Sequence, residues 1–270
     1  MPAPVREEEM FRFCCVAAAV LLLTCPARAE TIRLVYEPVE NPPRYYGTTA
    51  QVPNNKPGVT IEVFREAARR LNVTLTFERV PWKRGLFMVE TGESDGIFHA
   101  SYRPERAEFG AYPMLADGKT PDQSRAVFFQ SYSFYVRREA GLSFDGRRLS
   151  GTQGRAVAVT RGYSVIGELK ALGIPIEEER TQTLNLAKLD NGRVAAYAEL
   201  DNMIAPYLAE HGGPFTGIVK LRPAISEKAY YLLFSKPFYK NNTKLADAFW
   251  NEIRAINNSP LIGEIIGKYR

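Results

Sequence analysis

The sequence predicts an α/β fold, because segments that alternate apolar with polar residues take turns along the chain with segments of helical periodicity. One such series covers residues 31–101, and a second covers residues 155–212. A long β-rich segment, 128–141, separates the two series, and a shorter one, 228–236, follows the second. Two series and two connecting segments predict two α/β lobes around mostly parallel sheets.

The first series contains three predicted strands and two predicted helices. They are the strand 31–37, a helix after Gly58, the strand 73–80, a helix from Pro81 to Gly92, and a strand that begins at Asp95. Residues 42–47 form a loop, because two prolines followed by a glycine continue neither a helix nor a strand. Pro81 fits the first turn of its helix, where its missing N–H is not needed.

The second series repeats the pattern three times. The predicted segments are the strands 155–162, 174–180 and 193–200 and the helices 164–172, 183–192 and 202–212. Two further helices, 243–259 and 261–270, close the chain after the second β-rich segment. Two crossings between the lobes would return the C-terminal part of the chain to the first lobe.

The charges of the chain do not predict binding to nucleic acid. The 270 residues carry a net charge of +5, but 35 basic residues are nearly matched by 30 acidic ones. Lysine and arginine never occur more than two in a row, whereas a nucleic-acid interface usually has a clustered basic face. We therefore expect no nucleic-acid partner.

Residues 1–29 have the pattern of a cleaved signal peptide. The apolar run 16–23 is followed by the small residues of "ARA", which fit cleavage after Ala29. This run is too short to span a bilayer. Met10 is an alternative start, because the acidic residues 7–9 are unusual at the beginning of a signal. We expect export to the periplasm.

All three cysteines, Cys14, Cys15 and Cys25, lie within the predicted signal peptide. The mature chain is therefore expected to form no disulfide and to hold no reactive thiol. An alternative is that Cys25 is a lipoprotein cysteine, although "LLT" before it lacks the small residue usual there. With only two histidines in the chain, a His-rich metal site is excluded, and no cofactor is expected.

Five segments carry a resemblance to a known family: "PPRYY", "KPGVTIEVFREAARRLNVTLTFERVPW", "GESDGIFHASYRPERAEFGAYP", "RGYSVIGEL" and "LDNGRVAAYAEL". In this order and at this spacing, over nearly the whole mature chain, they resemble the family 3 extracellular solute-binding proteins. Those are periplasmic receptors of ABC importers for polar amino acids.

The resemblance implies a type II periplasmic binding protein fold, with two α/β lobes joined by two hinge strands and a ligand cleft between them. The first lobe would comprise residues 30–131 and a return segment, 229–270, and the second lobe residues 132–228. The implied function is capture of a small carboxylate-bearing solute by lobe closure and its delivery to an ABC permease. We expect a monomer without enzymatic activity.

The resemblance implies that Arg106 grips the carboxylate of the ligand, with Ser101 as a hydroxyl donor. The chemistry of the side chain agrees, because a guanidinium offers paired donors that match a carboxylate. The alternative is a surface ion pair with Glu105 or Glu108. For Arg103, we expect a solvated side chain.

The second lobe is expected to contribute the turn before its first helix. Free N–H groups at such a turn form an anion site, so Ser164 is a candidate contact, with Arg161 and Tyr163 at the edge of the cleft. An ordinary helix N-cap at Ser164 is the alternative. No thiol, metal or cofactor contributes to this predicted site.

Aromatic side chains are expected to form walls of the cleft. Trp82 lies where the family places a ring against the ligand, and Tyr36 and Tyr45 lie on or after the first strand. Flat rings hold apolar parts of a ligand and attract cations. Each tyrosine has core packing as its alternative.

The family pattern breaks at Leu200. Amino-acid receptors of this family usually carry an aspartate there for the ligand's ammonium group, and leucine accepts no hydrogen bond. One alternative is that a shift of one residue brings Glu199 or Asp201 into the cleft in that role, because strand side chains alternate between faces. The other is that the ligand lacks an ordinary α-amino group.

Two other functions remain open at this point. A few family members resemble periplasmic dehydratases, and His99 with Glu199 would then form the acid–base pair if both reach the cleft; a packed His99 is the alternative. The chain also fits a soluble ligand-sensing partner of a membrane receptor.

Overall fold

The computed structural model describes residues 30–210 and 212–269, so the predicted signal peptide lies outside the described residues. The residues from Thr31 onward form one unit. The strands are β1 (Thr31–Tyr36), β2 (Thr74–Arg79), β3 (Gly96–Ser101), β4 (Gly110–Ala111), β5 (Phe128–Arg137), β6 (Ser143–Phe144), β7 (Leu149–Ser150), β8 (Val157–Thr160), β9 (Ile176–Glu179), β10 (Ala196–Leu200), β11 (Ile218–Lys220) and β12 (Ser226–Ser235).

Helices connect these strands, as the alternating pattern predicts. They are α2 (Val59–Leu71), α3 (Trp82–Thr91), α4 (Pro104–Ala107), α5 (Val165–Ala171), α6 (Gln182–Asp190), α7 (Asp201–Glu210), α8 (Gly212–Phe215), α9 (Lys236–Asn241), α10 (Thr243–Asn257) and α11 (Pro260–Gly267). Two short 3₁₀ turns, η1 (Gln123–Arg125) and η2 (Arg138–Ala140), flank β5. Within the described residues, no helix is long and apolar enough to cross a membrane.

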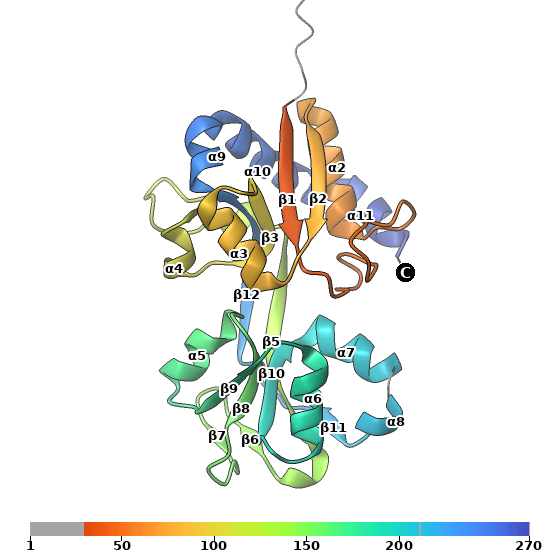
Figure 1. The fold of residues 1–270 in the computed structure, drawn as a ribbon, viewed down its shortest axis with the longest axis vertical. Coiled ribbons are helices and arrows are strands. Elements are labelled where there is room, and N and C mark those ends of the chain that lie inside the picture. Colours follow the sequence, from red (N-terminus) through yellow and green to blue (C-terminus); the bar gives the residue numbers. More distant parts are fainter. Residues whose placement is uncertain (1–29, 211, 270) are drawn as a thin grey trace, which may run out of the picture. The chain divides into compact units, whose positions relative to one another are not determined.

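The main sheet has two parallel strand groups with antiparallel strands between them. Its order is β2-β1-β3-β12-β5-β10-β8-β9, with β4 beside β12 and β11 beside β5. The group β2-β1-β3 is parallel, and so is β10-β8-β9. The long strands β5 and β12 pair with each other and run between the groups (Figure 1). They are the two predicted β-rich connectors, and the α/β class is confirmed.

Helix α2 shows how local sequence sets an element of the first group. Gly58 precedes it with φ of 117°, and a Cβ there would lie 2.3 Å from the carbonyl oxygen of Arg44. Its first turn carries Glu62, and Asn72 ends the helix in the left-handed conformation. Its buried face packs against α10, which returns from the C-terminal part of the chain.

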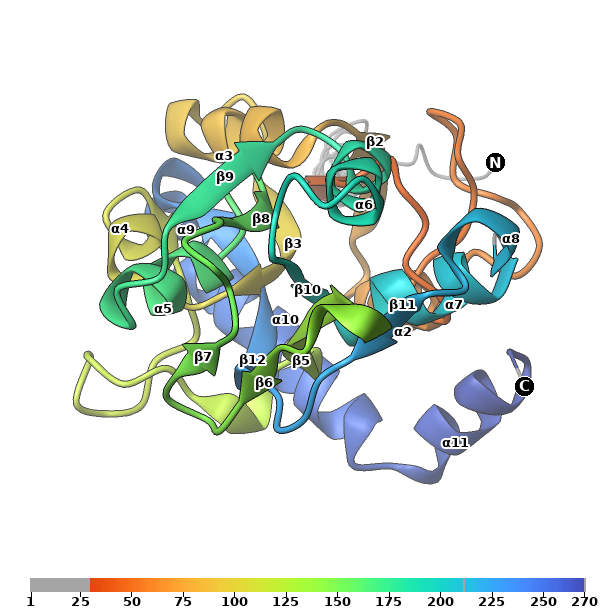
Figure 2. The same ribbon diagram turned by 90° about the horizontal axis from the view of Figure 1, so that it is seen from below.

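Helices also cover the second strand group on both sides. Figures 1 and 2 show α5 and α6 on opposite sides of β8. The apolar face of α6, with Leu186 and Leu189, is fully buried. The two-stranded sheet of β6 and β7 stands apart from the main sheet. This arrangement agrees with two predicted lobes, whose residue boundaries stay a prediction.

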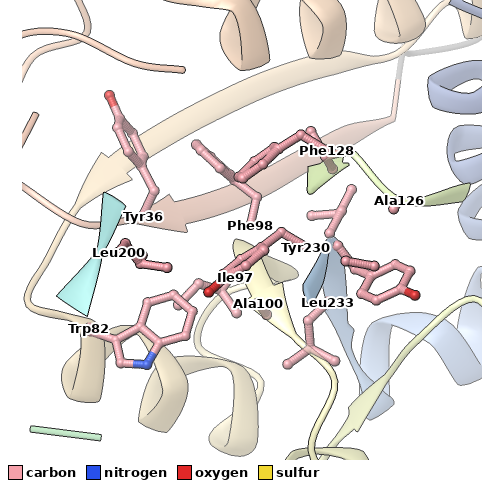
Figure 3. Packing of buried hydrophobic residues seen from close by; sticks show 14 of the residues in the cluster. Tyr36, Trp82, Ile97, Phe98, Ala100, Ala126, Phe128, Leu200, Tyr230 and Leu233 are labelled. Carbon is pink, nitrogen blue, oxygen red and sulfur yellow. The ribbon is translucent and has the colours of Figure 1, made fainter. Parts of the chain in front are cut away.

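The core of the first group centres on aromatic rings. The Phe98 side chain on β3 is fully buried and stacks on Tyr36, with 4.7 Å between ring centroids. Phe64 from α2 meets the Phe98 ring edge-on, with 5.1 Å between ring centroids. Figure 3 shows Tyr36, Phe98 and Phe128 within this packed region. The rings fix β3 against its neighbours and so position the loop that follows it.

We predict that Phe98→Ala lowers the free energy of unfolding by about 3–5 kcal/mol, because it removes a fully buried ring and leaves a cavity. The measurement is urea unfolding followed by circular dichroism. Phe129→Ala on β5 is the matched control, because that ring is 48% exposed, and its cost should stay within about 0.5 kcal/mol. Equal losses in both variants would contradict the assignment of Phe98 to the core.

Candidate functional site

Residues from both strand groups line one small pocket. Its volume is about 20 Å³, which holds about one water molecule. The lining residues are Glu37, Asn41, Trp82, His99, Ser101, Arg106, Gln130, Tyr132, Tyr163, Ser164, Leu200 and Tyr230. Glu37, Ser101 and Leu200 follow or end the strands β1, β3 and β10, and ligands of α/β sheets bind at such carboxyl ends.

Arg106 lies in this pocket and is 5% exposed. Its Nη1 donates to the carbonyl oxygen of Ser101 at 2.9 Å and to the Ser101 hydroxyl at 3.3 Å. Its Nη2 donates to the carbonyl oxygen of Gly162 at 3.1 Å, and the guanidinium lies 5.2 Å from the centre of the Trp82 ring. The surface ion pair with Glu105 or Glu108 does not form, and the structure brings Arg106, Ser101 and Trp82 together.

Arg103 and Arg106 differ because Arg106 lies within the short helix α4 and is buried, whereas Arg103 lies just before that helix. Arg103 precedes α4, and Pro104 occupies the first turn of that helix. The Arg103 side chain is 25% exposed and forms an ion pair with Glu105. Arg103 is therefore less solvated than expected, but it does not line the pocket.

The turn before α5 brings two of the three predicted second-lobe residues to the pocket. Tyr163 and Ser164 line it, and the Ser164 hydroxyl accepts a hydrogen bond from Lys228 Nζ at 3.0 Å. Ser164 makes no side-chain capping bond, so it is not an ordinary N-cap. Arg161 lies outside the lining residues, and its backbone N–H pairs with β9 through Glu179.

Glu37 is the acidic residue of the pocket that sequence reasoning missed. The Tyr163 hydroxyl donates to both of its carboxylate oxygens, at 3.1 and 2.9 Å. The pKa of Glu37 is raised to about 7: burial raises it most, the Tyr163 hydrogen bond lowers it, the charge of Glu199 raises it and the charge of Arg106 lowers it. Its place at the carboxyl end of the first strand was the available signal.

Tyr36 and Tyr45 lie in the hydrophobic core and not in the pocket, which favours their alternative role. Neighbouring strand residues point to opposite faces, so Glu37 reaches the pocket while Tyr36 points into the core. There Tyr36 meets Tyr45 edge-on at 5.0 Å. Tyr45 in turn lies 5.0 Å from the His99 ring, behind the pocket wall.

Neither predicted substitute for the missing aspartate lines the pocket. Leu200 lines it, and Glu199 points the other way, where it accepts hydrogen bonds from Thr160 and from the neighbouring Tyr197. Burial raises the pKa of Glu199. Asp201 begins α7, accepts a hydrogen bond from the Tyr135 hydroxyl at 2.9 Å and pairs with Lys220.

His99 lines the pocket because the strand is irregular there. In the pairing of β3 with β12, Ala100 and Phe98 have partners but His99 is skipped, so His99 is the extra residue of a β-bulge with φ of 66°. Its Nε2 lies 3.0 Å from the Thr60 hydroxyl. None of the hydrogen bonds among the described residues joins His99 to Glu199, so the acid–base pair of the enzyme hypothesis is not assembled.

No family model and no curated protein matches the chain. Among solved structures, a histidine kinase sensor domain with similarity to periplasmic binding proteins has a TM-score of 0.70 at 17% identity, covering 90% of this chain and 96% of that chain. The substrate-binding protein of an amino acid ABC transporter has a TM-score of 0.66 at 17% identity, covering 88% and 98%.

A third similar structure is the GluR0 ligand-binding core from Nostoc punctiforme in complex with L-glutamate. Its TM-score is 0.64 at 14% identity, and the match covers 88% of this chain and 98% of that chain. Identities at this level show the fold alone. The chain has the type II periplasmic binding protein fold, in agreement with the resemblance to the family 3 solute-binding proteins.

Proposed function

We propose that the protein is a periplasmic receptor that captures a small carboxylate-bearing solute, an amino acid or a related polar compound, and delivers it to an ABC permease. The observation that carries the proposal is the burial of Arg106 without a carboxylate partner among the described residues. This guanidinium is nearly buried in the pocket, yet no ion pair joins it to a carboxylate within the described residues. A buried cation is costly unless it is paired, and a ligand carboxylate would pair it.

Glu37 supplies the opposite charge in the same pocket. A zwitterionic ligand would place its carboxylate on Arg106 and its ammonium group on Glu37. Glu37 follows β1 in the first strand group, whereas Leu200 ends β10 in the second. The negative group comes from a different strand than the family pattern implies. The missing aspartate therefore does not argue against an amino-acid ligand.

Lobe closure is the expected mode of capture. Hydrogen bonds join residues of 30–131 to residues of 132–228 around the pocket: Arg106 to Gly162, Tyr163 to Glu37 and Asn202 to Asn41. A pocket of about 20 Å³ admits an amino acid only after these contacts open. The ligand would then take the place of these contacts and hold the two sides together through its own contacts with both.

Transport and sensing share this capture step. The similar structures include the binding protein of an amino acid ABC transporter, which supports a permease partner, and a histidine kinase sensor domain, which supports a membrane receptor as the second candidate partner. We propose that the protein acts as a monomer. We also propose that it has no catalytic activity, because the pocket holds groups that bind charge but lacks the predicted acid–base pair. The predicted signal peptide supports a periplasmic location.

We predict that Arg106→Ala weakens binding of an amino acid found by a thermal-shift screen by about 30- to several-thousand-fold, because it leaves the ligand carboxylate without its charged partner. Isothermal titration calorimetry measures the affinity. Arg106→Lys, which keeps the charge, checks that the loss does not come from misfolding. Arg103→Ala is the matched control outside the pocket, and its affinity should change less than about threefold. Equal stabilisation of wild type and Arg106→Ala by the ligand would refute the assignment of Arg106 as the residue that binds the ligand carboxylate.

We predict that affinity for an amino acid weakens as the pH falls from 8 towards 5.5. The carboxyl of Glu37 has a pKa of about 7, and only its ionised form pairs with an ammonium group. Binding therefore releases a proton at neutral pH and is favoured at higher pH, with up to about a tenfold loss per pH unit below the pKa. Calorimetric titrations at several pH values measure this slope.

The variant Glu37→Gln tests the source of that slope. It should bind more weakly than wild type at pH 8, and its affinity should stay constant between pH 5.5 and 8. His99 also lines the pocket, but burial lowers its pKa well below its ordinary value, so His99 is not expected to cause the slope. An unchanged slope in Glu37→Gln would assign the titration to Glu199 or to the ligand instead.

A further inference from the structure

Gln130 on β5 is a pocket residue whose polar atoms the structure leaves unpaired. Its side chain is 7% exposed and lines the pocket. Neither its amide nitrogen nor its amide oxygen has a hydrogen-bond partner among the described residues. Leaving a buried donor and acceptor unpaired is costly, so an amide in this position indicates a partner that arrives with the ligand.

The side chains of β5 around Gln130 form a wall that carries no charge of its own, and the guanidinium of Arg44, 4.2 Å from the centre of the Phe128 ring, lies outside the lining residues of the pocket. Phe128, Gln130 and Tyr132 alternate along β5 and therefore share a face. Phe128 stacks on Tyr230 of β12 at 5.3 Å and meets the His99 ring edge-on at 4.4 Å. The wall thus combines two strands and the bulge of β3 in one continuous surface.

His99 adds a further unpaired atom to this wall. Its Nε2 contacts Thr60, while its Nδ1 is buried without a hydrogen-bond partner in the part of the chain that the structure describes. Burial, helped by the charge of Arg44, lowers the pKa of His99 well below its ordinary value, so the imidazole is neutral. The left-handed backbone of the bulge turns this ring towards the pocket.

The one cation opposite Gln130 in the strand register is already paired. Lys228 on β12 pairs in register with Gln130, and its Nζ contacts Glu168 and the Ser164 hydroxyl. Its charge therefore has a counter-charge without a ligand. A ligand that placed a full charge against Gln130 would bury it without a partner, which is costly.

The Arg106 anchor and the wall lie close together along β3. Ser101, beside Arg106, and His99, in the wall, are two residues apart in sequence with the bulge at His99, and both line the same small pocket. A compound with its carboxylate on Arg106 would therefore bring a group a few bonds away to Gln130 and His99.

We infer that Gln130, with His99 Nδ1, selects solutes whose end remote from the carboxylate is an uncharged group that both donates and accepts hydrogen bonds, such as a carboxamide. This inference rests on the proposed function, because it takes Arg106 as the anchor. Gln130 would then determine which solute binds, and Arg106 would hold the carboxylate that all candidate solutes share.

The test compares L-glutamine, L-glutamate and L-norleucine by calorimetry with the purified protein. Wild type should bind L-glutamine at least about tenfold more tightly than either of the others, because only the carboxamide pairs with an uncharged donor and acceptor. Gln130→Met, of similar length but without the amide, should weaken L-glutamine by about 10- to 100-fold and leave L-norleucine unchanged or tighter. Gln123→Met is the matched control at an exposed glutamine.

A second variant keeps the test independent of packing. Gln130→Glu retains the shape of the side chain but adds a negative charge, so L-lysine should bind at least about tenfold more tightly to it than to wild type. An equal loss of all three probes in Gln130→Met, or a wild type that prefers L-glutamate or L-norleucine, would overturn the inference. If binding is lost in Arg106→Ala but wild type does not prefer L-glutamine, only this inference is refuted. If binding is unchanged in Arg106→Ala, the proposed function is refuted.

Discussion

The antiparallel pairing of β5 with β12 is the constraint on which the rest of the structure depends. These two strands are the backbone ladder between the parallel groups β2-β1-β3 and β10-β8-β9. Their register places Gln130 and Tyr230 on the pocket wall, and the pairing of β12 with β3 creates the bulge at His99. The same ladder that holds the two groups together thus also carries much of the surface that a solute would meet.

The order of elements could be predicted because period-two and period-3.6 patterns are local properties of the sequence. Among the candidate site residues, Trp82, Ser101, Arg106, Tyr163 and Ser164 lie together in the pocket. Their contact could be anticipated because loops after parallel strands meet at one edge of a sheet. The roles of these residues stay predictions, since their position alone does not identify a ligand.

The remaining pocket residues depended on information that the sequence does not contain. Alternation along the first strand separates Tyr36 from Glu37 but does not say which of the two faces is the core. The bulge at His99 exists only relative to the partner strand β12, so nothing within "GIFHAS" reveals it. Gln130 lies within the predicted β-rich segment 128–141, and only the register of β5 against β12 places it opposite Lys228.

The two tryptophans of the chain occupy contrasting surroundings. Trp250 is buried in the core, where its indole N–H donates to the carbonyl oxygen of Leu232 at 2.9 Å. Trp82 lines the pocket beneath the guanidinium of Arg106, beside Leu200 and Tyr230 (Figure 3). Any solute that draws the guanidinium away from this ring changes the electric field at one indole and leaves the other untouched. Under the proposed function, the fluorescence of Trp82 would report solute uptake, and Trp250 would serve as the internal reference.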